Sequence, residues 1–159
     1  MRQLTGAKHV IAYANGTLAL YASLIAAGIK PGDEVLVPDL TFIASANSVI
    51  MAGAKPVFVD VDKKTFCIDA GKAEEKVTVR TRAIMPVHLY GQAADMDKIM
   101  PFAKKHGLNV IEDAAEALGS TYKGRRCGSI GDFGVLSFNG NKIITTSGGG
   151  ALLCRAKRP

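Results

Sequence analysis

Residues 95–113 read DMDKIMPFAKKHGLNVIED, and this stretch holds the pattern that decides the fold. Apolar residues recur at helical spacing in its first half, which predicts a helix over Asp95–His106. Pro101 interrupts that pattern and predicts a kink or a later helix start, because proline has no backbone N–H. Leu108–Ile111 follows as a continuous, mainly apolar segment, which is typical of a strand covered on both faces. The stretch therefore predicts a helix that leads into a buried strand.

The same alternation of strand and helix extends along the rest of the chain. Short apolar segments predict further strands at His9–Ala14, Glu34–Pro38, Pro56–Asp60, Arg82–His88, Phe133–Phe138 and Ala151–Cys154. Helical spacing predicts helices at Thr17–Ala27, Thr41–Ala52 and Asp69–Lys76, the second with Thr41 as its N-cap. The basic, glycine-containing segment Ser120–Ile130 predicts a hairpin or a loop. This order of elements predicts an α/β fold with a mostly parallel sheet.

The composition excludes several classes of protein. A chain of 159 residues that is 48% hydrophobic suits one domain with a buried core, not a disordered tail. Lys and Arg number 20 against 14 Asp and Glu, which gives a net charge of +6. Because the basic residues are scattered and no base-stacking motif accompanies them, a solvated basic surface is favoured over a nucleic-acid face. Three widely spaced cysteines favour free thiols in a reducing compartment over disulfides or zinc.

One uncharged segment is long enough to raise the question of a membrane span. Val10–Ile29 carries no charged residue. Asn15, Gly16 and Thr17 lie within it, and this tripeptide favours a turn before a helix. We therefore expect a buried strand, a turn and a helix there, and no membrane span. The N-terminus also lacks the pattern of a secretory signal peptide.

Residues that could carry chemistry follow the predicted strands or begin a predicted helix. Asp113 ends a buried strand, where a carboxylate needs a helix N–H, an ion pair, a ligand's ring nitrogen or a metal. Its neighbour Glu112 is predicted to point to the opposite face. Lys142 is either a surface residue or a desolvated nucleophile. Gly16 and Thr17 form either a simple helix cap or a phosphate-binding helix N-terminus. Because ligands of open α/β sheets collect beyond the carboxyl ends of the strands, we expect one cleft to hold these residues.

Seven stretches, in this order, resemble one known family. They are NGTLAL (15–20), PGDEVLVP (31–38), TFIASAN (41–47), PVFVDVD (56–62), PVHLYG (86–91), VIEDAAEA (110–117) and SFNGNK (137–142). Together they are similar to the DegT/DnrJ/EryC1/StrS sugar aminotransferases, which are pyridoxal-phosphate enzymes of fold type I. The resemblance covers nearly the whole chain. It implies a three-layer α/β/α fold, the large cofactor-binding domain of that fold type.

The resemblance implies the principal roles at a pyridoxal-phosphate site. Lys142 matches the lysine that forms a Schiff base with the cofactor and shuttles a proton. Asp113 matches the aspartate that pairs with the protonated pyridine nitrogen and keeps the ring an electron sink. Phe42 matches the aromatic residue that stacks on the ring. Some relatives carry histidine in place of the lysine and are dehydratases, so Lys142 favours an aminotransferase.

Further cofactor contacts are implied in the same way. The residues that match phosphate binders are Gly16, Thr17 and Ser137. Glu116 stands where many members carry glutamine or histidine near the ring hydroxyl, so we expect it in the site. Asn141 and His88 are expected to line the pocket.

The implied reaction transfers an amino group from glutamate to a nucleotide-linked keto-sugar. The implied setting is a cytoplasmic homodimer whose site needs no metal. Family members are longer at both ends, so residues 1–159 are expected to form a partial large domain without the C-terminal small domain. Two other functions stay open. One is a non-catalytic fold-type-I fragment that acts as a binding or assembly module, and the other is a polyanion-binding protein whose binding depends on salt.

Overall fold

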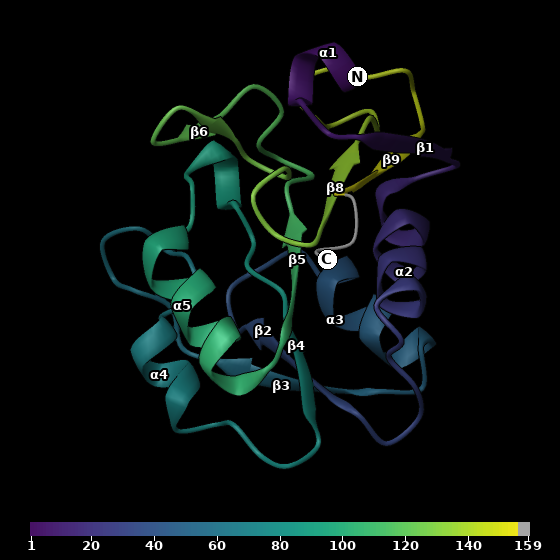
Figure 1. The fold of residues 1–159 in the computed structure, drawn as a ribbon. Helices are drawn as coiled ribbons and strands as arrows, with labels where there is room; N and C mark the ends of the chain where they lie inside the picture. Colours follow the sequence, from purple (N-terminus) through teal and green to yellow (C-terminus); the bar gives the residue numbers. More distant parts are fainter. Residues whose placement is uncertain (156–159) are drawn as a thin grey trace.

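The computed structural model describes residues 1–155, in which seven strands form one sheet (Figure 1). The strands are β1 (His9–Tyr13), β2 (Glu34–Pro38), β3 (Lys55–Val59), β4 (Thr81–Ile84), β5 (Asn109–Asp113), β8 (Phe133–Ser137) and β9 (Gly150–Cys154). Their order across the sheet is β1-β9-β8-β5-β4-β2-β3. Every pair from β8 to β3 is parallel, whereas β9 runs antiparallel to both β1 and β8. The predicted, mostly parallel sheet is confirmed.

Helices cover the sheet on both faces. The helices α2 (Gly16–Ala26) and α3 (Ala44–Met51) lie on one face, and α4 (Ala70–Glu74) and α5 (Met96–His106) lie on the other (Figure 1). Each helical layer has its own cluster of buried apolar side chains, the first including Leu24 and Val49 and the second including Ile99. A short helix α1 (Arg2–Thr5) and a 3-10 turn η1 (Leu89–Gly91) complete the helical elements of residues 1–155. The implied three-layer α/β/α architecture is confirmed.

The uncharged segment Val10–Ile29 folds as expected into β1, a turn and α2. Asn15 caps α2, because its side chain accepts a hydrogen bond from the N–H of Leu18 at 2.9 Å. Gly28 follows the helix with a φ of 78°, a conformation that glycine adopts without strain. No helix within residues 1–155 is long and apolar enough to cross a membrane.

Two predicted boundaries at the carboxyl edge of the sheet are wrong. The helix expected from Thr41 begins at Ala44, and its N-cap Ile43 offers no side-chain hydrogen bond. The hydroxyl of Thr41 instead lies 2.8 Å from the hydroxyl of Ser45, so it is used in a side-chain contact and not in a cap. The strand expected over residues 82–88 ends at Ile84, shortly before Pro86, which has no N–H for the ladder.

Pro101 does not reset the start of its helix. Helix α5 begins at Met96 and runs through Pro101 to His106, so the predicted later start is wrong. The missing N–H leaves the carbonyl of Asp97 without its helical partner. Asp97 is exposed in the first turn, where water can bond to such a carbonyl.

The segment between β5 and β8 contains the predicted hairpin. Strands β6 (Thr121–Tyr122) and β7 (Arg125–Arg126) pair in antiparallel fashion. Lys123 and Gly124 connect them, both with positive φ, as a tight two-residue turn requires. The three cysteines are free thiols, as expected, and Cys67 and Cys127 are buried.

Candidate functional site

One cavity lies at the carboxyl ends of β5 and β8, with a volume of about 290 Å³. Its walls include all eight residues that the sequence assigns to a cofactor site: Gly16, Thr17, Phe42, Asp113, Glu116, Ser137, Asn141 and Lys142. The eight positions converge because parallel strands bring their carboxyl ends to one edge of the sheet. A larger cavity of about 540 Å³ lies at the amino ends of the same two strands and includes none of the eight.

One wall of the cavity is the N-terminus of α2 against the end of β8. Gly16 is the first residue of α2, and a Cβ placed there would lie 2.9 Å from Cβ of Ser137. Real side chains do not approach so closely, so this position requires glycine or a displacement of Ser137. Backbone N–H groups without helical partners point out of such a terminus, and they favour an anion. Thr17 and Ser137 add hydroxyl groups to the same wall.

Another wall holds the carboxylate of Asp113, which is 4% exposed. Its Oδ2 accepts a hydrogen bond from Oγ of Ser45 at 2.8 Å, and its Oδ1 accepts one from the N–H of Ala115 at 3.1 Å. Burial raises the pKa of Asp113, and the two hydrogen bonds and the positive charge of Lys142 oppose that rise. A buried carboxylate held in this way is suited to pair with a cationic group of a ligand.

The only lysine of residues 1–155 on the cavity wall is Lys142, whose side chain is 7% exposed. Its Nζ lies 3.1 Å from Oε1 of Glu116 and 5.2 Å from the centre of the Phe42 ring. The second oxygen of Glu116 accepts a hydrogen bond from the N–H of Tyr90 at 3.0 Å. Lys142 is therefore a fixed, nearly buried amine, and the surface alternative left open by the sequence is wrong.

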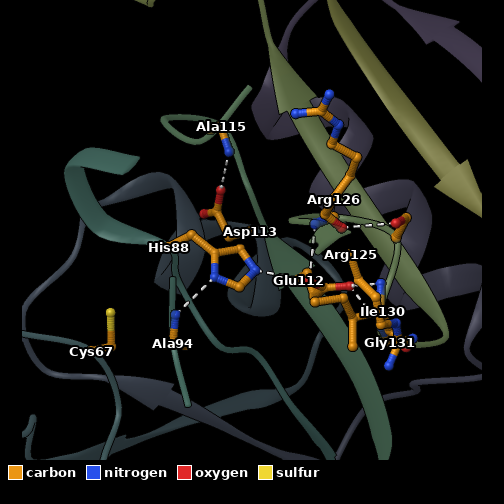
Figure 2. A network of polar contacts seen from close by, with 12 residues as sticks. Cys67, His88, Ala94, Glu112, Asp113, Ala115, Arg125, Arg126, Ile130 and Gly131 are labelled. Carbon is orange, nitrogen blue, oxygen red and sulfur yellow. Dashed lines mark hydrogen bonds and ion pairs between the residues drawn. The ribbon is translucent and has the colours of Figure 1, made fainter. Parts of the chain in front are cut away.

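The expectation that His88 lines the cavity is wrong. His88 is fully buried and is not part of the cavity wall. Its Nε2 lies 2.8 Å from Oε2 of Glu112, and its Nδ1 accepts a hydrogen bond from the N–H of Ala94 at 3.0 Å (Figure 2). Glu112 points away from Asp113, as the alternation of side chains along a strand predicts.

Sequence reasoning missed two residues that hold the site together. Ser45 bonds the carboxylate of Asp113, and Tyr90 bonds Glu116 through its backbone. Ser45 left only a weak signal, because it is one of three polar residues in this short helix, with Asn47 and Ser48, and the sequence does not single it out. Tyr90 left none, since its contact is made by the main chain in a left-handed conformation with a φ of 51°.

Comparison with known proteins places the chain in a family. The sequence profile of the DegT/DnrJ/EryC1/StrS aminotransferase family matches residues 1–158. The chain belongs to this family. Its similarity to GDP-perosamine synthase of Caulobacter vibrioides is 61% identity over 147 residues, which cover 92% of this chain and 40% of that protein. This member of the DegT/DnrJ/EryC1/StrS family thus spans about 40% of the length of the curated relatives it matches.

Solved structures agree with the family assignment. The aminotransferase from Psychrobacter cryohalolentis matches with a TM-score of 0.95 at 48% identity, over 98% of this chain and 40% of that one. The protein ntda from Bacillus subtilis, solved with bound cofactor PMP, matches with a TM-score of 0.91 at 39% identity, over 98% and 35%. PMP is the pyridoxamine form of pyridoxal phosphate. Among residues 1–155 of this family member, no cluster of three or more His, Cys, Asp or Glu side chains is placed to hold a metal ion.

Proposed function

We propose that this chain forms the pyridoxal-phosphate site of an enzyme that transfers an amino group from glutamate to a nucleotide-linked keto-sugar. The observation that carries the proposal is the pairing of two groups in one cavity. Lys142 offers a nearly buried amine, and Asp113 offers a buried carboxylate. Family membership and the name of the GDP-perosamine synthase relative support the class of reaction and substrate.

The cavity fits the phosphate end of the cofactor. A Cβ on Gly16 would overlap Ser137. Because residue 16 is glycine, the start of α2 can pack closely against Ser137 at the place where we expect the phosphate. Asn15 caps the N–H of Leu18 with its own side chain, so we expect a phosphate to use the N–H of Thr17, one residue earlier. We assign phosphate binding to Gly16, Thr17 and Ser137.

The cavity also fits the pyridine ring of the cofactor. Asp113 is a buried negative charge whose hydrogen-bond partners are neutral, so a ring nitrogen that carries a proton would supply the missing countercharge. Phe42 is 57% exposed on the cavity wall, and its ring lies 5.2 Å from Nζ of Lys142, so a planar ring bound at Lys142 could stack on it. Asn141 and Glu116 offer polar atoms for the ring substituents.

Three residues of this chain would then have separate roles in the reaction. When bound, pyridoxal phosphate supplies an electron sink for the bond that breaks at the substrate carbon. Asp113 would hold the ring nitrogen protonated by its negative charge. Lys142 would hold the cofactor covalently through Nζ and would then move a proton to and from the substrate carbon as a free amine. Glu116, at 3.1 Å, is placed to hold that Nζ in position during the proton transfer.

Two parts of the setting are also proposals. We infer a homodimer, because residues close in sequence to the cavity wall expose apolar side chains, namely Leu40, Ile43, Tyr90, Ile143 and Ile144. We infer a cytoplasmic location, which the three free cysteines support. Residues 1–159 would correspond to part of the cofactor-binding large domain of fold type I.

The test is an absorbance titration of the purified chain with pyridoxal phosphate, before and after borohydride. We expect a visible band that borohydride abolishes, and a phosphopyridoxyl group at Lys142 by peptide mass spectrometry. Lys142→Ala should lack both, whereas Lys98→Ala, at an exposed position, should keep both. The absence of a band that requires Lys142 would refute cofactor binding by this chain.

The same preparation tests the reaction class. Glutamate should discharge the band and release 2-oxoglutarate in an amount equal to the bound cofactor, and a keto-sugar nucleotide should restore the band. A band that glutamate leaves unchanged would support the alternative of a non-catalytic binding module.

A further inference from the structure

Glu112 is a buried carboxylate that uses all of its hydrogen-bonding capacity, although it does not touch the cavity. Its exposure is 0%. Oε1 accepts hydrogen bonds from the N–H groups of Ile130 and Gly131, both at 2.6 Å. Oε2 accepts one from the N–H of Gly128 at 2.9 Å and lies 2.8 Å from Nε2 of His88 (Figure 2). These four contacts satisfy the hydrogen-bonding capacity of the buried carboxylate and fix its position.

The geometry fixes the hydrogens of His88. Its Nδ1 accepts a hydrogen bond from the N–H of Ala94 at 3.0 Å, so the ring carries no proton there in its neutral form. Nε2 therefore bears the proton and donates to Glu112. The ring cannot change to the other tautomer without placing two donors, Nδ1–H and the N–H of Ala94, against each other.

His88 holds both residues of the Glu112-Asp113 pair. Its ring bonds the side chain of Glu112, and its backbone N–H donates to the carbonyl of Asp113 at 3.0 Å. The N–H of Asp113 in turn donates to the carbonyl of Pro86 at 2.9 Å. The end of β5 is thus clamped to the segment that follows β4, once through the main chain and once through Glu112.

The same carboxylate also anchors the loop of residues 127–131 against β8. A Cβ on Gly134 would overlap the backbone of Gly128, so loop and strand are in close backbone contact. Strand β8 continues from Gly134 to Ser137 at the cavity. Glu112 therefore links three segments whose ends form the cavity: the end of β5, the chain after β4 and, through the loop, β8.

We propose that Glu112 is the positioning residue for Asp113, and that its contact with His88 sets where the Asp113 carboxylate stands in the cavity. The two side chains point to opposite faces because they are neighbours on a strand, so any rotation of this strand end displaces both. The consequence for cofactor binding rests on the proposed function, whereas the placement of Asp113 does not.

Glu112→Gln is the informative variant, because it keeps the size of the side chain. An amide has one acceptor oxygen, and its NH₂ group would face two of the present donors whichever way it turned. His88→Leu is the second variant. It removes the ring donor but leaves Glu112 bonded to three main-chain N–H groups, so it suits the case in which Glu112→Gln folds poorly.

Glu34→Gln is the matched control. Glu34 is also buried, at 1% exposure, and also accepts hydrogen bonds, from Thr78 and Arg80. It is the first residue of β2, at the opposite edge of the sheet from the cavity. Loss of the Glu34 charge should lower the free energy of unfolding without moving Asp113.

The first measurement follows the carboxyl carbon of Asp113 by NMR as the pH is changed, without cofactor. In Glu112→Gln and in His88→Leu we expect its titration midpoint to fall by about half a pH unit or more, because a displaced carboxylate is better solvated. His88→Leu is the decisive variant, because Glu112→Gln also lowers the midpoint by removing a neighbouring negative charge. Glu34→Gln should leave the midpoint at its wild-type value. An unchanged midpoint in the Glu112 and His88 variants would overturn the proposal.

The second measurement compares pyridoxal phosphate with its analogue that has CH in place of the ring nitrogen. Glu112→Gln should weaken binding of pyridoxal phosphate about tenfold, as the loss of an outer hydrogen-bond partner does at metal sites, and should leave binding of the analogue unchanged. Equal losses for both compounds would overturn the proposal, because they would show a general loss of structure. If the wild type binds neither compound, the proposed function fails and the NMR titration alone decides the role of Glu112.

Discussion

Nζ of Lys142 lies 3.1 Å from Oε1 of Glu116, and the other oxygen of that carboxylate is bonded to the backbone of Tyr90. Glu116 therefore ties the segment after β8 to the segment after β4 across the cavity. The side chains of Lys142 and Glu116 are only 7% and 21% exposed, so water and salt screen their attraction less than that of a surface pair.

Glu116→Gln should lower the free energy of unfolding by about 1.5 kcal/mol, because it removes a charge-assisted hydrogen bond to a nearly buried ammonium. Urea denaturation measures the change. Asp97→Asn breaks the exposed pair of Asp97 with Lys123 and serves as the control, with no measurable change expected. Equal effects of the two substitutions would show that the Glu116–Lys142 pair is no stronger than a surface pair.

Asp113→Asn should stabilise the chain while it abolishes cofactor binding. Burial raises the pKa of Asp113 above the ordinary 3.8, so the folded chain keeps this proton to higher pH than the unfolded chain does. The contribution of Asp113 to stability is thus full below pH 3.8 and is lost as the pH rises through the raised pKa. We expect a gain of about 1 kcal/mol at pH 7 and a flatter dependence of stability on pH.

Thermal unfolding of the Asp113→Asn variant across a pH series tests whether the substitution raises stability at pH 7. The asparagine amide can keep both partners of the carboxylate. Its oxygen can accept a hydrogen bond from the N–H of Ala115, and its NH₂ group can donate one to the hydroxyl of Ser45. The hydroxyl of Ser45 can then donate to that of Thr41. A variant less stable than the wild type at pH 7 would show that attraction to Lys142 outweighs the burial of the carboxylate.

Gly16→Ala should weaken binding of pyridoxal phosphate by about tenfold or more, or 1.4 kcal/mol. The added methyl group would lie 2.9 Å from Cβ of Ser137 and would force the two phosphate-binding segments apart. Gly140→Ala is the control, because a Cβ there meets nothing within 4 Å. The prediction fails if both variants bind the cofactor as tightly as the wild type.

Phe42→Ala should separate binding from stability. Phe42 is 57% exposed, so its removal should change the free energy of unfolding by less than about 0.5 kcal/mol. Loss of the stacking surface should weaken cofactor binding about fivefold. Phe58→Ala removes a phenyl ring of similar exposure, 50%, from β3 away from the cavity, and should not affect binding. Equal binding by both variants would exclude contact between Phe42 and the cofactor.

Cys127 should resist thiol reagents in the folded chain. Burial raises the pKa of its thiol to about 11, and the nearby charge of Glu112 contributes to the rise. Only about one molecule in a thousand then carries a thiolate at pH 8. Reaction with a disulfide reagent, followed by peptide mass spectrometry, should leave Cys127 unmodified until guanidinium chloride unfolds the chain. Rapid labelling of Cys127 in the folded chain would contradict its buried position.

Local patterns were sufficient for the mostly parallel sheet and for most of the cavity residues, whereas the family resemblance supplied the three-layer architecture and Glu116. An apolar run such as Leu108–Ile111 indicates a strand without reference to its neighbours. Parallel pairing then brings the ends of the strands to one edge, where Asp113 and Ser137 meet the start of α2. The seven motifs supplied the roles that composition and periodicity left open.

What the sequence could not indicate depends on contacts between distant segments. Thr41 has the residue type of a helix cap, but its hydroxyl contacts Ser45 and the helix begins three residues later. His88 has the residue type of a site residue, but Glu112 and the N–H of Ala94 hold its ring in the core. A histidine with two buried partners and one that faces a cavity look alike in a single sequence.

Strands β1 and β9, the first and last strands within residues 1–155, lie side by side, with His9 opposite Cys154. Gly149 also bridges to Asn15, immediately before the glycine that begins α2 at the cavity. At a synthesis rate of 5–20 residues per second, β9 is therefore made on the order of ten seconds after β1, and β1 has no pairing partner during that interval. The parallel strands β2 to β5 can assemble within that time, whereas Gly149 can pair with Asn15, next to the wall formed by Gly16 and Ser137, only later. A chain released after residue 142 would thus already carry Asp113 and Lys142, but β1 would lack its partner β9 and would be open to pairing with other chains.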